Sequence, residues 1–260
     1  MPILDRIWIY PIKSLDGVSV SEAQILQSGA LKGDREFALF DRLGRYVNAK
    51  RTARIHQLRA QFDLASRRVS VREEGTSDWV EFGMDGDRSG LEAWLSEFFG
   101  YRVWVKQNEE AGFPDDTNYP GPTVVATKTL STVAEWFDGV DTAQLQRRMR
   151  VNLEVGEAEA FWEDRLCVNG DLGVPFRIGD SVTLAGTNPC SRCVVPTRNP
   201  VTGERTDTFQ KSFVDRRKAT FPEWGNPNRY NHYYRLTTNT RLLDASDGGL
   251  IRVGDRVELV

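Results

Sequence analysis

Residues 33–48 read GDREFALFDRLGRYVN and are typical of a chain built from short strands and tight turns. The apolar run at residues 37–40 has the length of a strand, and residues 41–45 carry the Asp and Gly that tight turns favour. Residues 46–48 are expected to form the returning strand. The pattern predicts antiparallel β-structure in this part of the chain.

The same succession of strands and turns extends through the sequence. Residues 3–9 alternate apolar and polar positions, and residues 68–72 and 79–82 predict a hairpin. Residues 176–182 (FRIGDSV) resemble residues 251–257 (IRVGDRV), and each predicts a strand, a Gly-Asp turn and another strand. We interpret this pair as one barrel-corner device used twice, not as a repeat protein.

Helical spacing is limited to a few stretches. One has apolar residues at Leu91, Trp94, Leu95 and Phe98. A second follows the apolar strand at residues 123–126 and has Thr127 or Thr129 as its expected cap, with apolar residues at Leu130, Val133, Ala134, Trp136 and Phe137. The chain is therefore expected to be a β-rich α+β protein with a few short helices.

A polar segment indicates two domains. A chain of 260 residues could form one large β-rich domain or two smaller ones. Residues 108–122 are polar and contain prolines, which makes them the best linker candidate. We place the boundary within this segment, with one domain at residues 1–115 and another at residues 116–260.

Composition excludes several classes of protein. The 34 Lys and Arg against 37 Asp and Glu give a net charge of −3, whereas a protein that coats nucleic acid needs a basic balance. No apolar run approaches the roughly 20 residues of a membrane span, and the N-terminus lacks a signal-peptide pattern. We expect a cytoplasmic protein that binds neither nucleic acid nor membrane.

The chemistry is most concentrated at residues 188–197 (NPCSRCVVPT), which hold two of the three cysteines. A Cys-x-x-Cys pair can be half of a zinc site, a redox dithiol, or a loop that holds one thiolate for a soft metal. A zinc site needs further ligands, and Cys167, His56 and His232 are the candidates. The two cysteines could also be small buried residues without chemistry.

Five segments carry a resemblance to a known family. They are YPIKS at residues 10–14, GDR at 33–35 with FD at 40–41, RMRVN at 148–152, PCSRC at 189–193 with PVTG at 200–203, and IRVGD at 251–255. In this order they resemble the MOSC proteins with an N-terminal MOSC β-barrel domain. Among these they are most similar to the mitochondrial amidoxime-reducing component and the bacterial YcbX-type molybdenum enzymes. The resemblance spans nearly the whole chain.

The resemblance implies a fold and a metal ligand. It implies an N-terminal β-barrel-like domain packed on a mixed β-barrel MOSC domain, with the molybdenum cofactor (Mo-molybdopterin) between them. The second cysteine of the pair, Cys193, is implied to be the protein ligand of molybdenum, a soft metal that accepts a thiolate. Arg192 is expected to favour the thiolate form of Cys193. Cys190 is expected to be structural.

Other residues match family positions that meet the cofactor. Lys13 and Ser14 suit a phosphate on the cofactor tail, and guanidinium and amide groups suit phosphate and the pterin edge. Val151 stands where the family pattern usually has Pro. The predicted cofactor-binding residues are Lys13, Ser14, Arg35, Thr127, Arg150, Asn152, Arg192 and Cys193.

The activity implied by the resemblance is molybdenum-dependent reduction of N-hydroxylated compounds, such as hydroxylamines, amidoximes and N-hydroxylated bases, to amines. Three cysteines are too few for an ordinary iron–sulfur cluster, and no dinucleotide-binding Gly-x-Gly-x-x-Gly follows a strand. A separate electron donor protein of the ferredoxin or flavoprotein type is therefore expected. The alternatives are a carrier of the molybdenum cofactor without turnover, or a sulfur-carrier MOSC protein that uses Cys193 as a persulfide.

Overall fold

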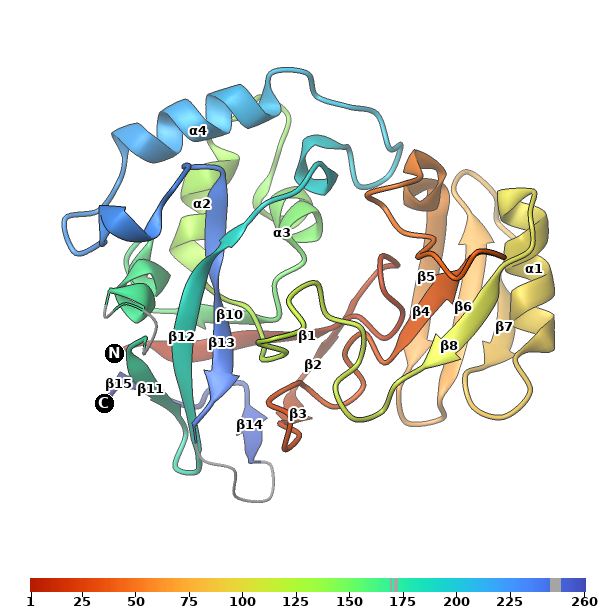
Figure 1. Ribbon diagram of the computed structural model, residues 1–260, viewed down its shortest axis with the longest axis horizontal. Coiled ribbons are helices and arrows are strands. Elements are labelled where there is room, and N and C mark those ends of the chain that lie inside the picture. The colour runs from red at the N-terminus through yellow and green to blue at the C-terminus, as the bar shows by residue number, and fades with distance from the viewer. Residues whose placement is uncertain (169, 171–172, 244–248) are drawn as a thin grey trace.

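The chain forms a β-rich α+β fold in the computed structural model, which describes all residues except 169, 171–172 and 244–248. The strands are β1 (Ile3–Ile9), β2 (Val18–Val20), β3 (Glu22–Gln24), β4 (Phe37–Phe40), β5 (Leu58–Asp63), β6 (Arg68–Glu73), β7 (Val80–Gly83), β8 (Trp104–Gln107), β9 (Val124–Ala126), β10 (Leu153–Gly156), β11 (Pro175–Ile178), β12 (Val182–Ser191), β13 (Arg235–Leu242), β14 (Leu250–Arg252) and β15 (Val257–Leu259). The α-helices are α1 (Ser89–Phe99), α2 (Thr127–Ala134), α3 (Thr142–Met149) and α4 (Phe209–Ala219). Figure 1 shows a larger part with α2, α3 and α4, and a smaller part with β4 to β8 and α1.

A mixed eight-stranded sheet forms the larger part, in the order β15-β11-β12-β13-β9-β10-β1-β2. Its strands β9 and β10 are parallel, and the other pairs are antiparallel. Backbone hydrogen bonds from Leu4 N to Asp255 O (2.8 Å) and from Val257 N to Pro2 O (2.9 Å) tie β1 to the segment that enters β15. The sheet therefore curls back on itself, but its ladder is not continuous and the barrel is not closed.

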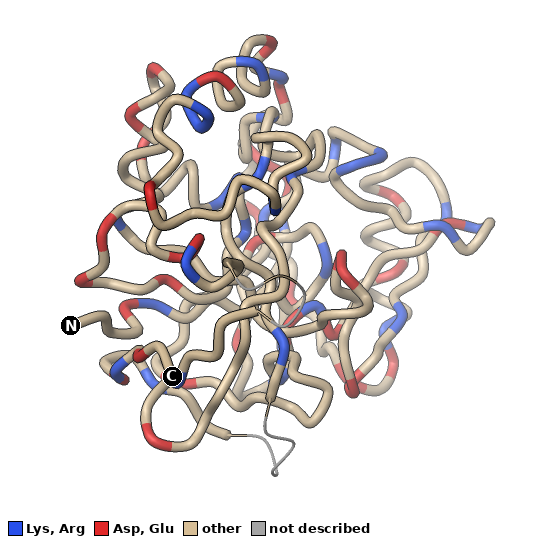
Figure 2. The backbone as a smooth tube through the Cα atoms, turned by 60° about the vertical axis from the view of Figure 1, so that its left-hand side comes forward, with Lys and Arg blue, Asp and Glu red and all other residues tan. Residues whose placement is uncertain are grey.

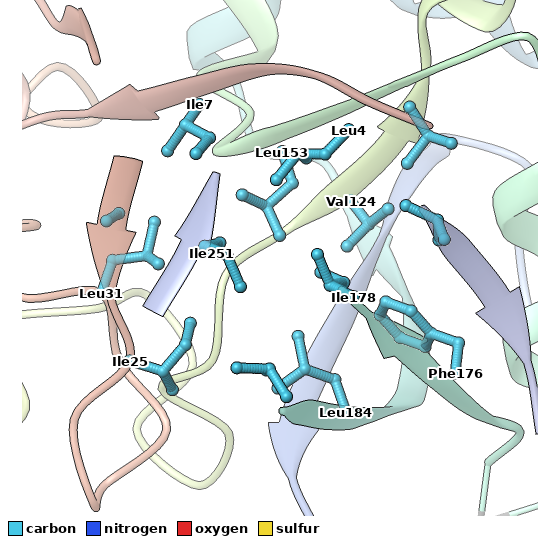
Figure 3. Close-up of a cluster of buried hydrophobic side chains, with 14 of the residues drawn as sticks. Leu4, Ile7, Ile25, Leu31, Val124, Leu153, Phe176, Ile178, Leu184 and Ile251 are labelled. Carbon is cyan, nitrogen blue, oxygen red and sulfur yellow. The ribbon is translucent and has the colours of Figure 1, made fainter. Parts of the chain in front are cut away.

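The inside of the curled sheet is filled by apolar side chains. Figure 3 shows Leu4 and Ile7 from β1 converging with Leu153 from β10 and Phe176 from β11. Each of these side chains has no exposed surface. Burying a side chain of this size stabilises the fold by about 1.5–3 kcal/mol relative to leaving it exposed.

The smaller part has its own core. Here β4 pairs with β8, while β5, β6 and β7 form an antiparallel sheet. The helix α1 packs its apolar face inward and ends at Gly100, whose positive φ of 77° terminates the helix in the left-handed conformation. The most buried members of this core include Phe37, Val69, Val71, Leu91, Leu95 and Val103.

Three helices cover the outer face of the larger sheet (Figure 1). The helices α2 and α3 connect β9 to β10, as a crossover between parallel strands requires. The Asp141 side chain caps α3 by accepting a hydrogen bond from Gln144 N at 2.6 Å. Against these helices α4 buries Phe209 and Phe213, which are fully buried.

Most predicted elements are confirmed. The strand at residues 3–9 is β1. Residues 68–72 lie in β6, and residues 80–82 of the second predicted strand lie in β7, which pairs with β6. The two Gly-Asp corners are both present, but they differ. Residues 176–182 form a hairpin between β11 and β12, whereas β14 and β15 pair with other strands, so residues 251–257 turn the chain from one sheet to another.

Some local predictions are wrong. Residues 46–48 form no strand, since Tyr46 makes a single bridge to Phe40. Neither threonine caps α2: its N-cap is Ala126, and the Thr129 hydroxyl donates to Glu163 Oε2 at 2.9 Å inside the core. The helix also ends at Ala134, so it does not include Trp136 or Phe137. The helices α3 and α4 were not predicted.

A buried polar cluster lies between α4 and the sheet. Arg217 is fully buried and forms an ion pair with Asp164, while the Tyr230 hydroxyl donates to Asp164 Oδ1 at 2.7 Å. Burial, reinforced by the adjacent Asp164 charge, raises the pKa of the Glu163 carboxyl well above its usual range. At this place in the core, the ion pair of Arg217 and Asp164 is shielded from water and occupies space that apolar side chains would otherwise fill.

The proposed linker, residues 108–122, contains neither helix nor strand and passes between the two parts of the molecule (Figure 1). The first strands nevertheless join the later half of the chain, because β1 pairs with β10 and β3 pairs with β14. The domain boundary at residues 115 and 116 stays a prediction. No helix in the described ranges is long and apolar enough to cross a membrane.

Candidate cofactor site

A pocket of about 520 Å³ brings together residues that are far apart in the sequence. Seven of the eight predicted cofactor-binding residues line it. They are Lys13, Ser14, Arg35, Arg150, Asn152, Arg192 and Cys193. Residues 114–121 of the proposed linker form a further wall. Strand order explains the convergence, since β1, β10, β9, β13 and β12 are consecutive neighbours in the large sheet.

Three of these residues have strained backbone. Ser14 (φ 73°), Arg35 (φ 49°) and Arg150 (φ 54°) are in the left-handed region, which residues with side chains seldom adopt. In the described part of the chain, seven non-glycine residues have a positive φ. Such strain costs of order 1–3 kcal/mol at each residue and clusters at functional sites. Its concentration here supports a binding role for this pocket.

Tyr10 organises the two arginines. Its ring is buried, and the guanidinium carbons of Arg35 and Arg150 lie 4.9 Å and 4.3 Å from the ring centroid. The Tyr10 hydroxyl donates to Val151 O at 3.0 Å and accepts from Gln146 Nε2 at 2.8 Å. The tyrosine of the YPIKS segment therefore acts as a platform that orients both cations.

Arg35 links the first part of the chain to the second. Its Nη1 donates to Asp34 and to Asn152 Oδ1 (2.9 Å), and its Nη2 donates to Arg150 O (3.0 Å). Burial alone would lower the pKa of Arg35, but the adjacent Asp34 carboxylate outweighs burial and raises it. Arg150 has no carboxylate partner among the described residues, and burial lowers its pKa. Arg150 is thus the cation in greater need of a bound anion.

Lys13 anchors the linker segment. Its Nζ donates to Phe113 O and to Asp115 Oδ1, both at 2.7 Å. The Lys13 side chain is 10% exposed and that of Asp115 is 61% exposed. Burial lowers the pKa of Lys13, while the Asp115 carboxylate opposes this shift. Lys13 therefore holds the wall of the pocket as well as adding positive charge to it.

The two cysteines lie at the end of β12. Leu236 and Thr237 of β13 face Cys190 where the pairing shifts register, and Thr237 has a φ of 70°. A bulge of this kind redirects the chain that follows it. Cys190 and Cys193 are free thiols and are half-buried. Both line the pocket.

Arg192 forms its hydrogen bond with Cys190, whereas the sequence led us to expect that it acts on Cys193. Its Nη1 donates to Cys190 Sγ at 3.2 Å, and its Nη2 donates to Met149 O at 2.6 Å. The expectation that Arg192 favours the thiolate of Cys193 is therefore not supported by its hydrogen bonds. Cys190 and Arg192 form a pair that ties the end of β12 to α3.

Thr127 lies apart from the other predicted residues. It is absent from the lining of the pocket, and its hydroxyl bonds to Asp5 Oδ2 at 3.3 Å. The reason is the direction of β9: Thr123, just before this strand, lines the pocket, while Thr127 follows its opposite end. The structure thus places Thr127 outside this pocket, and its contact with the cofactor stays a prediction.

Several residues of the site were not predicted. Asp34, Asn188 and Asn239 line the pocket, and Asn239 Nδ2 donates to Asn188 Oδ1 at 3.2 Å. Asp34 lies within the GDR segment, which could have indicated it. The two asparagines carry no local signal, because only the pairing of β12 with β13 places them together.

The zinc alternative finds no support in the described ranges. No three His, Cys, Asp or Glu side chains converge there as a metal site would require. Cys167 is buried, and burial raises the pKa of its thiol to about 12. His232 bonds to Ser191 Oγ at 3.1 Å. Cys167 is thus buried in the core and does not line the pocket that holds Cys190 and Cys193.

Comparison with known proteins identifies the family. Residues 1–102 match the MOSC N-terminal beta barrel domain, and residues 124–258 match the MOSC domain. The chain belongs to the MOSC family. This MOSC protein is also 24% identical over 233 residues to mitochondrial amidoxime reducing component 2 of Macaca fascicularis, and the match covers 76% of this chain and 67% of the relative. The resemblance drawn from the sequence motifs is confirmed at the level of the family.

The pocket of this MOSC protein suits an anionic cofactor. Six cations line it against three carboxylates: Lys13, Arg35, Lys50, Arg148, Arg150 and Arg192 against Asp34, Asp115 and Asp116. Within the described residues, Arg150 Nη2 and Arg192 Nε are buried donors without a hydrogen-bond partner. Buried donors are nearly always paired, so these two atoms are suited to a bound anion. The free Cys193 thiol adds a soft metal ligand beside them.

Proposed function

We propose that this MOSC protein is a molybdenum-cofactor oxidoreductase that reduces N-hydroxylated compounds to amines. The observation that supports this proposal is that one pocket holds a free thiol at Cys193 together with more cationic side chains than carboxylates. The MOSC family is associated with the molybdenum cofactor, and the named relative is an amidoxime reducing component. The chemistry balances as an N–O bond cleaved by two electrons and two protons, with amine and water as products.

The chain's own residues would bind, orient and shield the reacting group. Cys193 would hold the metal, which supplies the two-electron redox chemistry when the cofactor is bound. Lys13, Arg35 and Arg150 would bind the anionic part of the cofactor. The hydrogen bond from Arg35 Nη2 to Arg150 O would also hold Arg150 in its strained conformation, and Asn152 accepts a hydrogen bond from Arg35 Nη1. Residues 114–121 would limit the access of water.

Metal content and turnover distinguish this proposal from its alternatives. The protein should be purified from a host that makes the cofactor, and bound molybdenum and reductant-dependent consumption of a hydroxylamine should be measured. Molybdenum with turnover supports the enzyme. Molybdenum without turnover under several donors indicates a cofactor carrier, and a persulfide on Cys193 without molybdenum indicates a sulfur carrier.

Lys13→Ala and Arg35→Ala are each expected to lower cofactor occupancy about tenfold or more. Each change removes a charge-assisted hydrogen bond worth about 1.5–3 kcal/mol. Occupancy is measured as molybdenum and pterin per protein after limiting cofactor supply. The control is Arg68→Ala, which removes an exposed ion pair with Glu81 outside the pocket. Full occupancy in both pocket variants would show that these cations do not bind the cofactor.

Turnover is expected to require an added electron donor. With NADH alone the pure protein should not reduce a hydroxylamine, because the sequence contains no dinucleotide-binding fingerprint and has three cysteines. A chemical reductant, or a ferredoxin or flavoprotein with its reductase, should restore activity. Substrate consumption is followed by product analysis. Sustained reduction by NADH alone, with no flavin in the sample, would contradict this prediction.

A further inference from the structure

A second cavity of about 280 Å³ adjoins the cofactor pocket. The two share Ser14, Ala49, Arg148, Arg150 and Val195 as wall residues. The second cavity extends away from Cys193 toward the short 3₁₀-helix at Ala53–Gln57, the start of β5 and the turn at residues 198–200. It thus lies where the two parts of the molecule meet.

The turn beside this cavity packs directly on the 3₁₀-helix. Gly203 has a φ of 76°, and a Cβ at this position would lie 2.8 Å from Ala53 O. Arg198 Nη1 donates to Gly203 O at 3.1 Å. The wall that carries Arg198 is therefore held in place by close backbone contact.

The cavity is strongly cationic. Five arginines line it against a single carboxylate, Asp16. The lining arginines are Arg59, Arg147, Arg148, Arg150 and Arg198. Asp16 is already engaged, since its Oδ1 lies 3.4 Å from Arg59 Nη1 and 3.3 Å from Arg147 Nη2. Glu74 pairs with Arg59 from outside the cavity at 3.2 Å. Most of the positive charge on the walls remains without a counterion among these groups.

Several donors on these walls lack partners. Arg148 Nε and Arg198 Nε are donors that are shielded from solvent and make no hydrogen bond with any described residue. His56 Nε2 is also shielded and unpaired, and on a neutral ring it donates or accepts according to the tautomer. Arg148 is 4% exposed and His56 is 9% exposed. Leaving a buried donor unpaired costs about 1–3 kcal/mol, so two unpaired guanidinium donors in one cavity indicate a missing acceptor.

The pKa shifts of two residues in the wall, His56 and Arg148, agree with this geometry. Burial, reinforced by the charges of Arg198, Arg150 and Arg59, lowers the pKa of His56 to about 4. Burial also lowers the pKa of Arg148. A bound anion would relieve both effects, because it offsets the cost of desolvated positive charge.

We infer that this second cavity binds the phosphate group of a small molecule. The guanidinium groups of arginines on α3, on β5 and in the turn at residues 198–200 can donate hydrogen bonds to several oxygens of one phosphate at the same time. The cavity is also many times larger than the roughly 30 Å³ that one water molecule occupies, which leaves room for the group that carries the phosphate. The inference does not depend on the proposed reductase activity.

Calorimetric titration with inorganic phosphate at constant ionic strength tests this inference on the full chain. Arg198→Gln removes one wall cation without touching the cofactor pocket, and Arg147→Gln removes an exposed one whose loss should leave the fold intact. Each is expected to raise the Kd for phosphate tenfold or more. Arg177→Gln, which breaks an exposed ion pair with Glu258 elsewhere, should leave the Kd unchanged.

Comparing cofactor-free with cofactor-loaded protein identifies the source of the phosphate. If loading abolishes phosphate binding, the cavity holds the phosphate of the cofactor; if binding persists, it serves a separate phosphorylated ligand. Either result supports the inference. An unchanged Kd in both Arg147→Gln and folded Arg198→Gln protein would overturn it, as would the absence of measurable phosphate binding in both forms of the wild-type protein.

Discussion

Cys193→Ala is expected to abolish reduction of N-hydroxylated substrates while the chain stays folded. Cys193 is a half-buried free thiol at the wall of the cofactor pocket, and no hydrogen bond from Arg192 reaches it in the described structure. Its loss would remove the proposed protein ligand of the metal without disturbing the core. Activity with a chemical reductant, molybdenum content and the number of sulfur ligands by X-ray absorption should be measured together.

Cys190→Ala is the matched control. This change removes the acceptor of the Arg192 hydrogen bond, so a modest loss of stability is expected, with activity per bound molybdenum retained. The two substituted cysteines lie three positions apart in one segment. In the described structure Arg192 donates a hydrogen bond to Cys190 and none to Cys193. If Cys190→Ala protein were folded and metal-loaded yet inactive, the ligand role would belong to Cys190 or be shared by both thiols.

Arg217→Ala is expected to cost about 3–5 kcal/mol of folding stability, because it leaves the buried Asp164 carboxylate without its cation. Arg217 and Asp164 are 0% and 4% exposed, so water cannot replace the lost partner. The guanidinium also packs 4.2 Å from the centroid of the Phe161 ring, a contact that alanine removes as well. Chemical denaturation followed by circular dichroism measures the change.

An exposed ion pair provides the control for this stability prediction. Arg177→Ala breaks the pair with Glu258, whose side chains are 45% and 38% exposed, and should cost no more than about 1 kcal/mol. Combining Arg217→Met with Asp164→Leu removes both charges and should recover much of the loss. Equal destabilisation by Arg217→Ala and Arg177→Ala would show that the buried pair does not contribute as described.

Short-range patterns predicted much of the fold. Short-range periodicity identified the strand β1, the hairpin of β6 and β7, and, through helical spacing, α1, because the period of side-chain burial is visible within a few residues. Local patterns did not predict α3 or α4, which are short and carry many polar residues, so tertiary packing decides their conformation. They also misplaced the cap of α2, where burial of Thr129 against Glu163 overrides capping.

Some features of the candidate site likewise followed from the sequence, and others only from the tertiary structure. The sequence by itself determined which residue types could serve it, since the motifs around Lys13, Arg35, Arg150 and Cys193 carry cations and a thiol. Only the tertiary structure decided that these groups share one pocket, that Arg192 bonds to Cys190, and that a second cationic cavity lies beside it. The physical reason is that sheet order and the arrangement of the site are set by contacts between residues far apart in the sequence, as in the hydrogen bonds from Arg35 to Asn152 and to Arg150, and no local pattern records such contacts.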